Sequence, residues 1–396
     1  MKDTATPTAA DRVPLTAAPA SSAGDDGSLP HLREIASFGH QVTGVAVAAD
    51  GRIFVNFPRW TEDAPISVGV LTPDGDVRPY PDDRWNGWRN ARRDELNPQD
   101  RWVCVQAMLC DSQNNLWVLD PGAPAQAFVV PGAPKLVRID LATDSVAGCI
   151  AFTLEIAPQG SYLNDVRISP DGRFAYITDS GTRGAIVVVD LGTGQACRVL
   201  DGHPSTQTDP GVTVHAGGAP LRRPDGRGVE FAADGIALTR DGLYLYWQAV
   251  KGKTLYRVPT EALRDTTLAT DEVGNRVEKV LEHRPADGLH IDRTGRLLIT
   301  AVEEHAVKVW DGATLTTLLH EPGLRWPDTF AEGPDGTIYL TDSRIPEMNW
   351  FKPGHPDALS SRLLIIADAA PSAAPDTKPG TPPGSQSEAD RNRSPD

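Results

Sequence analysis

One short unit occurs six times along this chain, and it limits the possible folds more than any other feature. Each copy is an apolar segment, a turn built from Asp-Gly, Thr-Gly or Asn-Asn, and a second apolar segment. In the first copy, residues 42–47 and 53–55 flank Asp50-Gly51. Glycine adopts the positive φ that tight hairpin turns require, so each copy predicts a β-hairpin. The six turns are centred on Gly51, Asn115, Gly172, Gly242, Gly295 and Gly336.

Further apolar segments follow most of the hairpins, for example residues 135–140, 185–190, 254–258 and 306–310. A hairpin with two additional strands is one blade of a β-propeller. The sequence therefore predicts an all-β, six-bladed β-propeller. We expect residues 362–366 to be the third strand of the last blade and residues 32–38 its fourth. A two-sheet sandwich is the alternative, but six similar hairpins argue against it, and only residues 259–264 resemble a helical turn.

The two ends of the chain differ in composition from the middle. Residues 1–29 and 369–396 are rich in Ala, Pro, Ser, Thr, Asp and Gly, and they have no hydrophobic periodicity. Such segments bury too little apolar surface to offset the entropy of ordering. We expect two disordered tails that flank one propeller domain at residues 30–368.

The charge balance excludes some partners. The chain has 53 acidic residues against 38 Lys and Arg, a formal net charge of −15. Such a surface repels phosphate backbones and anionic lipids, so we expect neither nucleic acid nor a membrane as partner. No apolar run approaches the roughly 20 residues of a membrane span. The N-terminus lacks the apolar core of a signal peptide, so we expect a cytoplasmic protein or a sequence recorded without its signal.

The four cysteines form no CxxC pair and no zinc-ligand pattern with histidine. We expect buried free thiols, because Cys is among the most buried residue types. Disulfides are the alternative, and they would need an oxidising compartment. The cysteines are Cys104, Cys110, Cys149 and Cys197.

The first strand of each blade lines the central channel of a propeller, and its first residues lie at one mouth. Six residues occupy those starts, and all carry side-chain oxygen atoms: Thr43, Gln106, Asn164, Asp234, Asp287 and Asp328. Carboxylates that lie close together repel unless a cation, an ammonium group or protons intervene. An oxygen-lined ring suits a hard cation such as Ca²⁺. A divalent cation, a water-filled polar channel and an amine-binding mouth are the three alternatives.

Aromatic residues and histidines near these strands are further candidates. Tyr162, Phe231, Trp247 and Trp326 lie near strand starts or ends, where they could stack on a flat or cationic ligand or simply pack between blades. A loop at residues 201–230 is rich in Gly, Pro and Arg, and we expect it to cover the channel mouth. Candidate general bases, for which a satisfied structural role is the alternative, are His203, His215, His283 and His290.

Several catalytic motifs are missing from the sequence. It contains no GxSxG nucleophile elbow, no Walker loop and no HExxH. Covalent serine or cysteine catalysis is therefore unsupported. If the protein is an enzyme, metal-assisted hydrolysis or acid–base isomerisation fits best.

Several long segments of the chain carry a resemblance to a known family. The clearest runs from Leu163-Asn164-Asp165-Val166 through residues 171–181 into residues 185–191, and it is followed by His203-Pro204-Ser205. The others are residues 115–122, 234–238, 243–247, 255–260 and 326–329. Together these segments resemble the major royal jelly protein/yellow family. The resemblance covers residues 31–366 and implies a six-bladed propeller whose central channel binds small molecules. Family roles are diverse, including ligand binding and catecholamine or dopachrome chemistry.

Residues 285–292, with Gly295-Arg296-Leu297, carry a second and more distant similarity. They resemble the metal-ligand blade of the senescence marker protein/gluconolactonase group, whose enzymes hold a divalent cation at one channel mouth. The similarity implies Asn164, Asp234 and Asp287 as metal ligands. Thr43 or Gln106 stands where the group has glutamate.

These observations lead to three hypotheses on function. The first is a small-molecule enzyme or binder at the channel mouth, gluconolactonase-like or a dopachrome-type isomerase. In it, Asp234 and Asp287 are catalytic and Ca²⁺ or another divalent cation is the cofactor. The second is a non-catalytic binder of amines or aromatic metabolites, and the third is an interaction scaffold. The expected ligand-binding residues are Thr43, Gln106, Asn164, Trp326 and Asp328.

Overall fold

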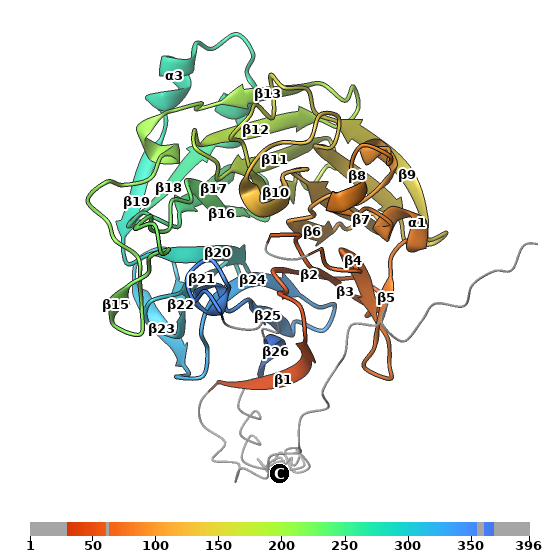
Figure 1. Ribbon diagram of the computed structural model, residues 1–396. Coiled ribbons are helices and arrows are strands. Elements are labelled where there is room, and N and C mark those ends of the chain that lie inside the picture. Colours follow the sequence, from red (N-terminus) through yellow and green to blue (C-terminus); the bar gives the residue numbers. More distant parts are fainter. Residues whose placement is uncertain (1–29, 61–62, 355–359, 368–396) are drawn as a thin grey trace, which may run out of the picture.

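The chain folds as a six-bladed β-propeller, which confirms the fold class that the repeats predict. The computed structural model describes residues 30–60, 63–354 and 360–367. Six four-stranded antiparallel sheets are arranged in a ring around a central axis (Figure 1). The predicted disordered tails at residues 1–29 and 369–396 lie outside the described residues.

The first three blades follow one another along the chain. Blade 1 comprises β2 (Gly44–Val47), β3 (Ile53–Asn56), β4 (Val68–Leu71) and β5 (Val77–Pro79). Blade 2 comprises β6 (Ala107–Cys110), β7 (Asn115–Asp120), β8 (Lys135–Asp140) and β9 (Ser145–Ala151). Blade 3 comprises β10 (Leu163–Ile168), β11 (Phe174–Asp179), β12 (Ala185–Asp190) and β13 (Ala196–Val199).

The last three blades complete the ring. Blade 4 comprises β16 (Ala233–Leu238), β17 (Tyr244–Ala249), β18 (Thr254–Pro259) and β19 (Glu278–Glu282). Blade 5 comprises β20 (Ala286–Ile291), β21 (Leu297–Ala301), β22 (Ala306–Trp310) and β23 (Leu315–His320). Blade 6 comprises β24 (Pro327–Glu332), β25 (Ile338–Asp342), β26 (Ser361–Ala367) and β1 (His31–Phe38).

The N-terminal strand closes the ring. β1 pairs antiparallel with β26, from His31 opposite Ala367 to Phe38 opposite Ser361. The last blade therefore takes three strands from the end of the chain and its outermost strand from the beginning (Figure 1). This confirms the predicted third and fourth strands of blade 6. Pairing β26 on both sides leaves it no open edge.

The hairpin turns connect the first and second strands as the Asp-Gly pattern predicts. Gly172 and Gly242 have φ of 69° and 74°, values that L-residues with a Cβ rarely adopt. In blade 2 the positive φ, 64°, falls on Asn114, one residue before the predicted turn centre. Asparagine tolerates this conformation better than most residues.

Apolar side chains between neighbouring sheets form the core. Phe54 of blade 1 packs in one cluster with Trp102, Val118 and Val137, and all four are fully buried. Similar clusters fill the spaces between the other blades. The blades thus bury both faces of each sheet, which explains the long apolar second and third strands.

Helices are few and short. The predicted helical turn is α2 (Thr260–Arg264), and α1 (Asp83–Asn86) and α3 (Thr270–Gly274) are the other α-helices of the described residues. A separate two-stranded hairpin joins β14 (His215–Ala216) and β15 (Ala219–Pro220). In the described part of the chain, no helix has the length and apolar character to cross a membrane. Short 3-10 turns are η2 (Asn90–Arg92), η3 (Pro98–Asp100), η4 (Pro124–Gln126), η5 (Pro204–Thr206) and η6 (Ile345–Glu347).

All four cysteines are free thiols, but the prediction that they are buried is wrong for two of them. Cys104 is buried and Cys110 is half-buried. Cys149 and Cys197 are exposed, because they lie on β9 and β13, the outermost strands of blades 2 and 3.

Candidate functional site at the channel mouth

Three aspartates meet at the mouth of the channel where the first strands of the blades begin, which we call the upper mouth. Asp234, Asp287 and Asp328 are each the second residue of β16, β20 and β24, the first strands of three successive blades. All three are buried, with 4–8% of their surface exposed. They line one small cavity, which we call the upper cavity. Its volume is about 10 Å³, and its walls are Trp60, Gln106, Gln126, Tyr162, Asn164, Ser180, Phe231, Asp234, Asp287, Asp328 and Ile345.

Glycines explain how these strands approach so closely. Gly235 follows Asp234, and a Cβ there would lie 1.9 Å from the carbonyl oxygen of Asp287. Gly288 follows Asp287, and a Cβ there would lie 1.8 Å from the carbonyl oxygen of Asp328. Only a residue without a side chain fits such a backbone approach. The two Asp-Gly pairs therefore bring the carboxylates of neighbouring blades together.

The surroundings disfavour ionisation of the three carboxyl groups. Burial raises the pKa of Asp287 to about 6, although a hydrogen bond from Trp326 Nε1 to its Oδ2, 2.5 Å long, favours the charged form. Burial, and then the charge of Asp287, raise the pKa values of Asp234 and Asp328 well above the usual value. Three ionised carboxylates in this space require a positive charge among them.

Neutral polar groups form the other side of the upper cavity. Trp60 Nε1 donates to the Tyr162 hydroxyl over 2.5 Å, and that hydroxyl donates to Gln106 Oε1 over 2.9 Å. Asn164 Nδ2 donates to Ser180 Oγ over 3.1 Å. Burial raises the pKa of Tyr162 well above its usual value, so the phenol stays protonated and remains a donor.

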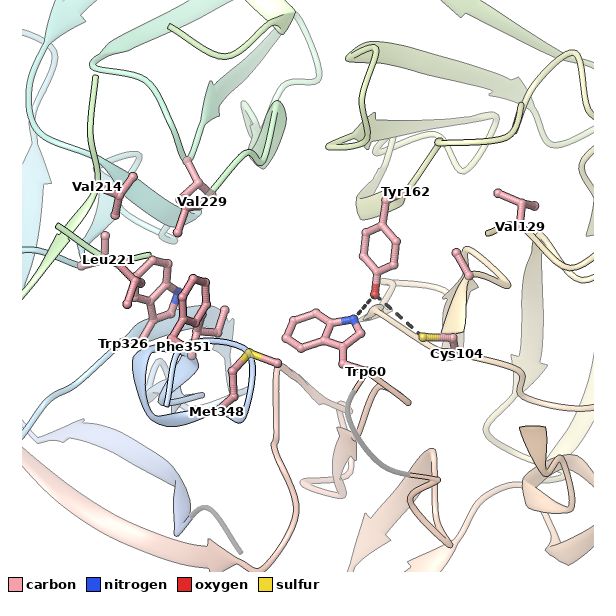
Figure 2. Close-up of a cluster of buried hydrophobic side chains, with 14 residues drawn as sticks. Trp60, Cys104, Val129, Tyr162, Val214, Leu221, Val229, Trp326, Met348 and Phe351 are labelled. Carbon is pink, nitrogen blue, oxygen red and sulfur yellow. Dashed lines mark hydrogen bonds between the residues drawn. The ribbon is translucent and has the colours of Figure 1, made fainter. Parts of the chain in front are cut away.

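An apolar cluster covers the upper mouth. Figure 2 shows Trp60 between Tyr162 on one side and Trp326, Met348 and Phe351 on the other. The Trp60 ring stacks on that of Trp350, with centroids 5.8 Å apart. The cluster therefore joins segments of several blades above the carboxylates.

The loop at residues 201–230 takes part in this cover, where we expected it. Its side chains Val214, Leu221 and Val229 belong to the same cluster as Trp60 and Trp326 (Figure 2). The guanidinium of Arg223 lies 4.2 Å from the ring centroid of Trp350, a cation–π contact.

The structure brings five of the six predicted strand-start residues together. Gln106, Asn164, Asp234, Asp287 and Asp328 all line the upper cavity. Thr43 is fully buried instead, where its hydroxyl accepts a hydrogen bond from Asn56 Nδ2 over 2.9 Å.

The aromatic candidates separate into two groups. Tyr162 and Phe231 line the upper cavity, and Trp326 lies directly beside it, bound to Asp287. Trp247 is fully buried inside blade 4, where its indole donates to the carbonyl of Ser205. Trp247 therefore has the alternative, structural role.

The four histidines lie elsewhere, and none of them lines the described walls of the upper cavity. His203 contacts Ser205, and His215 lies 3.4 Å from Glu303. His290 lies 3.5 Å from Glu332. Burial lowers the pKa of His283 to about 4.

Our sequence reasoning missed four residues of the upper cavity, and they share one origin. Trp60, Gln126, Ser180 and Ile345 each follow the second strand of a blade, namely β3, β7, β11 and β25. The second strand runs antiparallel to the first, so its end lies beside the start of the first. This rule places the segments after the second strands at the upper mouth, but it does not say which of their side chains line the cavity.

The polar side chains of the upper cavity are the candidate ligands of the predicted cation. Within the described residues, no three His, Cys, Asp or Glu side chains gather as metal ligands. A cation here would therefore need amide oxygen beside the carboxylates, and the Asn164 side chain lines the same cavity as Asp234 and Asp287. The donor set is made of oxygen, as Ca²⁺ and Mg²⁺ require.

Several solved structures are similar to this chain. A gluconolactonase from Xanthomonas campestris is 12% identical and superposes with a TM-score of 0.50, over 89% of this chain and 99% of that one. Regucalcin from Agrobacterium tumefaciens, described as calcium-binding, is 14% identical with a TM-score of 0.47, over 83% and 90%. Virginiamycin B lyase from Staphylococcus aureus is 14% identical with a TM-score of 0.45, over 78% and 81%.

No curated protein matches the sequence significantly. The major royal jelly protein family model matches residues 103–319, more than half of the chain. The match runs from the segment before β6 to β23 and so includes the first strands of blades 2 to 5. This chain therefore belongs to the major royal jelly protein family.

Proposed function

We propose that this protein binds a small, positively charged molecule at the upper mouth, with an amine as the charged group. One observation carries this proposal: three buried carboxyl groups share one cavity whose described walls contain no Arg, Lys or His. A ligand ammonium group would supply the missing positive charge, and the carboxylates would then ionise together.

The walls of the upper cavity suit the rest of such a ligand. Trp60, Tyr162 and Phe231 lie beside the carboxylates and offer aromatic surfaces to an amine. Aromatic faces attract cations and stack on flat rings. At about 10 Å³ the space holds roughly one water molecule, so a larger ligand must displace part of the apolar cover.

A divalent cation with metal-assisted hydrolysis, lactonase-like, is the second candidate. The single-ion size of the cavity and its oxygen donors favour it. Asn164, Asp234 and Asp287 would hold the ion, which when bound would polarise a substrate carbonyl. An isomerase that works without a bound ion is the other enzymatic option, because burial raises the pKa of Asp287 to about 6 and its carboxyl group would then exchange a proton near neutral pH.

Calorimetric titration with 2-phenylethylamine tests the main proposal. The same titration with 2-phenylethanol, a neutral molecule of similar shape, tests whether binding needs the positive charge. We expect the amine to bind and the alcohol to bind at least about tenfold more weakly. Combining Asp234→Asn with Asp287→Asn should weaken amine binding by about tenfold or more. The matched double variant Asp74→Asn with Asp94→Asn, at exposed sites, should change nothing.

Metal analysis of the same purified protein tests the second candidate, a bound divalent cation. Stoichiometric Ca²⁺ in the purified protein, with a melting temperature that falls on chelation, would support the cation. Lactones and other esters would then be screened as substrates. If the amine does not bind, or binds equally to the double variant, the amine proposal is wrong.

A further inference from the structure

An arginine spans the central channel below the three aspartates. Arg167 lies on β10 in blade 3, and its Nη2 donates to the carbonyl oxygen of Leu289 on β20 in blade 5, over 2.9 Å. Blade 4 stands between these two blades in the ring (Figure 1). A direct bond between first strands two blades apart must cross the channel, so the guanidinium occupies the channel itself.

Further contacts hold this guanidinium in place. Arg167 Nη1 donates to Asp165 Oδ1 over 2.8 Å and to the carbonyl oxygen of Val166 over 2.7 Å. The side chains of Arg167 and Asp165 are 13% and 14% exposed. A largely buried arginine that is held by three hydrogen bonds and an ion pair has little freedom to leave its position.

Arg167 also separates two spaces. The upper cavity, with its three carboxylates, lies above it. A second pocket of about 280 Å³ lies among the hairpin turns of blades 2 to 4, at the opposite mouth of the channel, and Arg167 is part of its wall with Leu109, Ile168 and Leu238. The two spaces share no described wall residue.

We propose that Arg167 is a plug that makes the channel a one-ended pocket and limits its ligand to a single positive charge. It occupies the path below the aspartates and neutralises Asp165, which would otherwise be a second anionic anchor deeper in the channel. A monoamine then binds at the upper cavity, whereas the second ammonium group of an α,ω-diamine meets a guanidinium. The selectivity for monoamines rests on the proposed function, amine binding. The closure of the channel is independent of that function.

A thiol-labelling experiment tests the closure without any ligand. Ser180→Cys places a thiol in the wall of the upper cavity. The background carries Cys110→Ser, Cys149→Ser and Cys197→Ser, which leaves only the fully buried Cys104. With a small methanethiosulfonate reagent, we expect Arg167→Ala to speed labelling about tenfold or more, because the path from the opposite mouth opens.

Three further variants keep this result interpretable. Arg167→Lys retains a cation of similar length and should label nearly as slowly as the parent. Arg257→Ala removes an arginine paired with Glu278 on the outer part of blade 4, and it should leave the rate unchanged. If Arg167→Ala has a clearly lower melting temperature than the parent, Arg167→Met replaces it in the labelling experiment. Equal labelling rates for the parent and for folded Arg167→Ala or Arg167→Met would overturn the plug.

Calorimetry with butylamine and 1,4-diaminobutane tests the selectivity. The wild type should prefer the monoamine, and Arg167→Met should shift the ratio toward the diamine by about tenfold. Adding Asp165→Asn to Arg167→Met should restore the wild-type ratio, because the deeper anchor is gone. An unchanged ratio in Arg167→Met would refute the selectivity. If no variant binds either amine, the proposed function fails, while the labelling rates still decide the plug.

Discussion

At the scale of single residues, the surroundings of a side chain determine its pKa and so its chemistry at the upper mouth. Asp287 lies in an Asp-Gly pair like those of the hairpin turns, but it is buried, whereas the turn aspartates are exposed. Burial raises its pKa, whereas backbone N–H groups lower the pKa of a turn aspartate such as Asp335. The sequence shows both as Asp-Gly, and only the position in the blade separates a buried carboxyl group of the upper mouth from a turn residue.

His283 gives a pH-dependent prediction at the same scale. Burial lowers its pKa from 6.5 to about 4, and its Nε2 is buried without a hydrogen-bond partner. The unfolded chain therefore takes up a proton between pH 6.5 and pH 4 that the folded protein does not. The free energy of unfolding therefore falls as the pH falls through that range, by about 3 kcal/mol in all.

His283→Gln should remove that part of the acid sensitivity. Urea unfolding of both proteins at pH 7.5 and pH 4.5 measures it, and the variant should lose less stability than the wild type. His320→Gln, at the exposed end of β23, is the control and should follow the wild type. If His283→Gln and the wild type lose the same amount, His283 is protonated in the folded protein.

At the scale of elements, an aspartate ends the second strand of three blades. Asp120, Asp179 and Asp342 each accept backbone N–H groups from the segment ahead of the first strand in their own blade. Each aspartate also forms a salt bridge, 2.6–2.9 Å long, with a basic residue of the third or fourth strand of its blade. The partners, in the same order, are Lys135, Arg198 and Arg362. This repeated pair ties the outer strands to the start of the inner strand.

Breaking one such pair should be costly. Lys135 and Asp120 are 1% and 0% exposed, so Lys135→Met leaves a buried carboxylate without its cation. We expect a loss of about 3–5 kcal/mol in the free energy of unfolding, measured with denaturant. The control Arg92→Met breaks an exposed pair with Glu95 and should cost less than about 1 kcal/mol. A similar cost for both variants would contradict the structural role of the buried pair.

The close approach of neighbouring first strands predicts a strong effect of a single methyl group. Gly288→Ala would place a Cβ against the carbonyl oxygen of Asp328, and the backbone of β20 or β24 must then move. We expect a loss of about 3 kcal/mol or more by thermal or denaturant unfolding. Gly148→Ala on β9, where the nearest atom lies 3.9 Å away, should be close to neutral. A neutral Gly288→Ala would mean that the inner strands are farther apart than described.

At the scale of the whole molecule, the ring depends on β1. This strand covers the edge of β26, and its Phe38 is buried against Phe57 of blade 1, with ring centroids 5.3 Å apart. Deleting residues 1–38 should therefore open blade 6 and lower the melting temperature by well over about 10 °C, or prevent folding. Deleting residues 1–29, which retains β1, is the matched control. Equal melting temperatures would show that the ring closes without β1.

The sequence by itself determined the number of blades, the hairpin turns, the closing strands and seven of the eleven residues that line the upper cavity. These features follow from local patterns, namely the alternation of apolar segments with Asp-Gly turns and the side chains next to the start of each inner strand. Tertiary structure alone decided that Trp60 and Ile345 cover the mouth, that Thr43 is withdrawn from it, and that Arg167 crosses to Leu289. The reason is physical: such contacts join segments of different blades, and their distances are set only when the ring closes and neighbouring strands pack together.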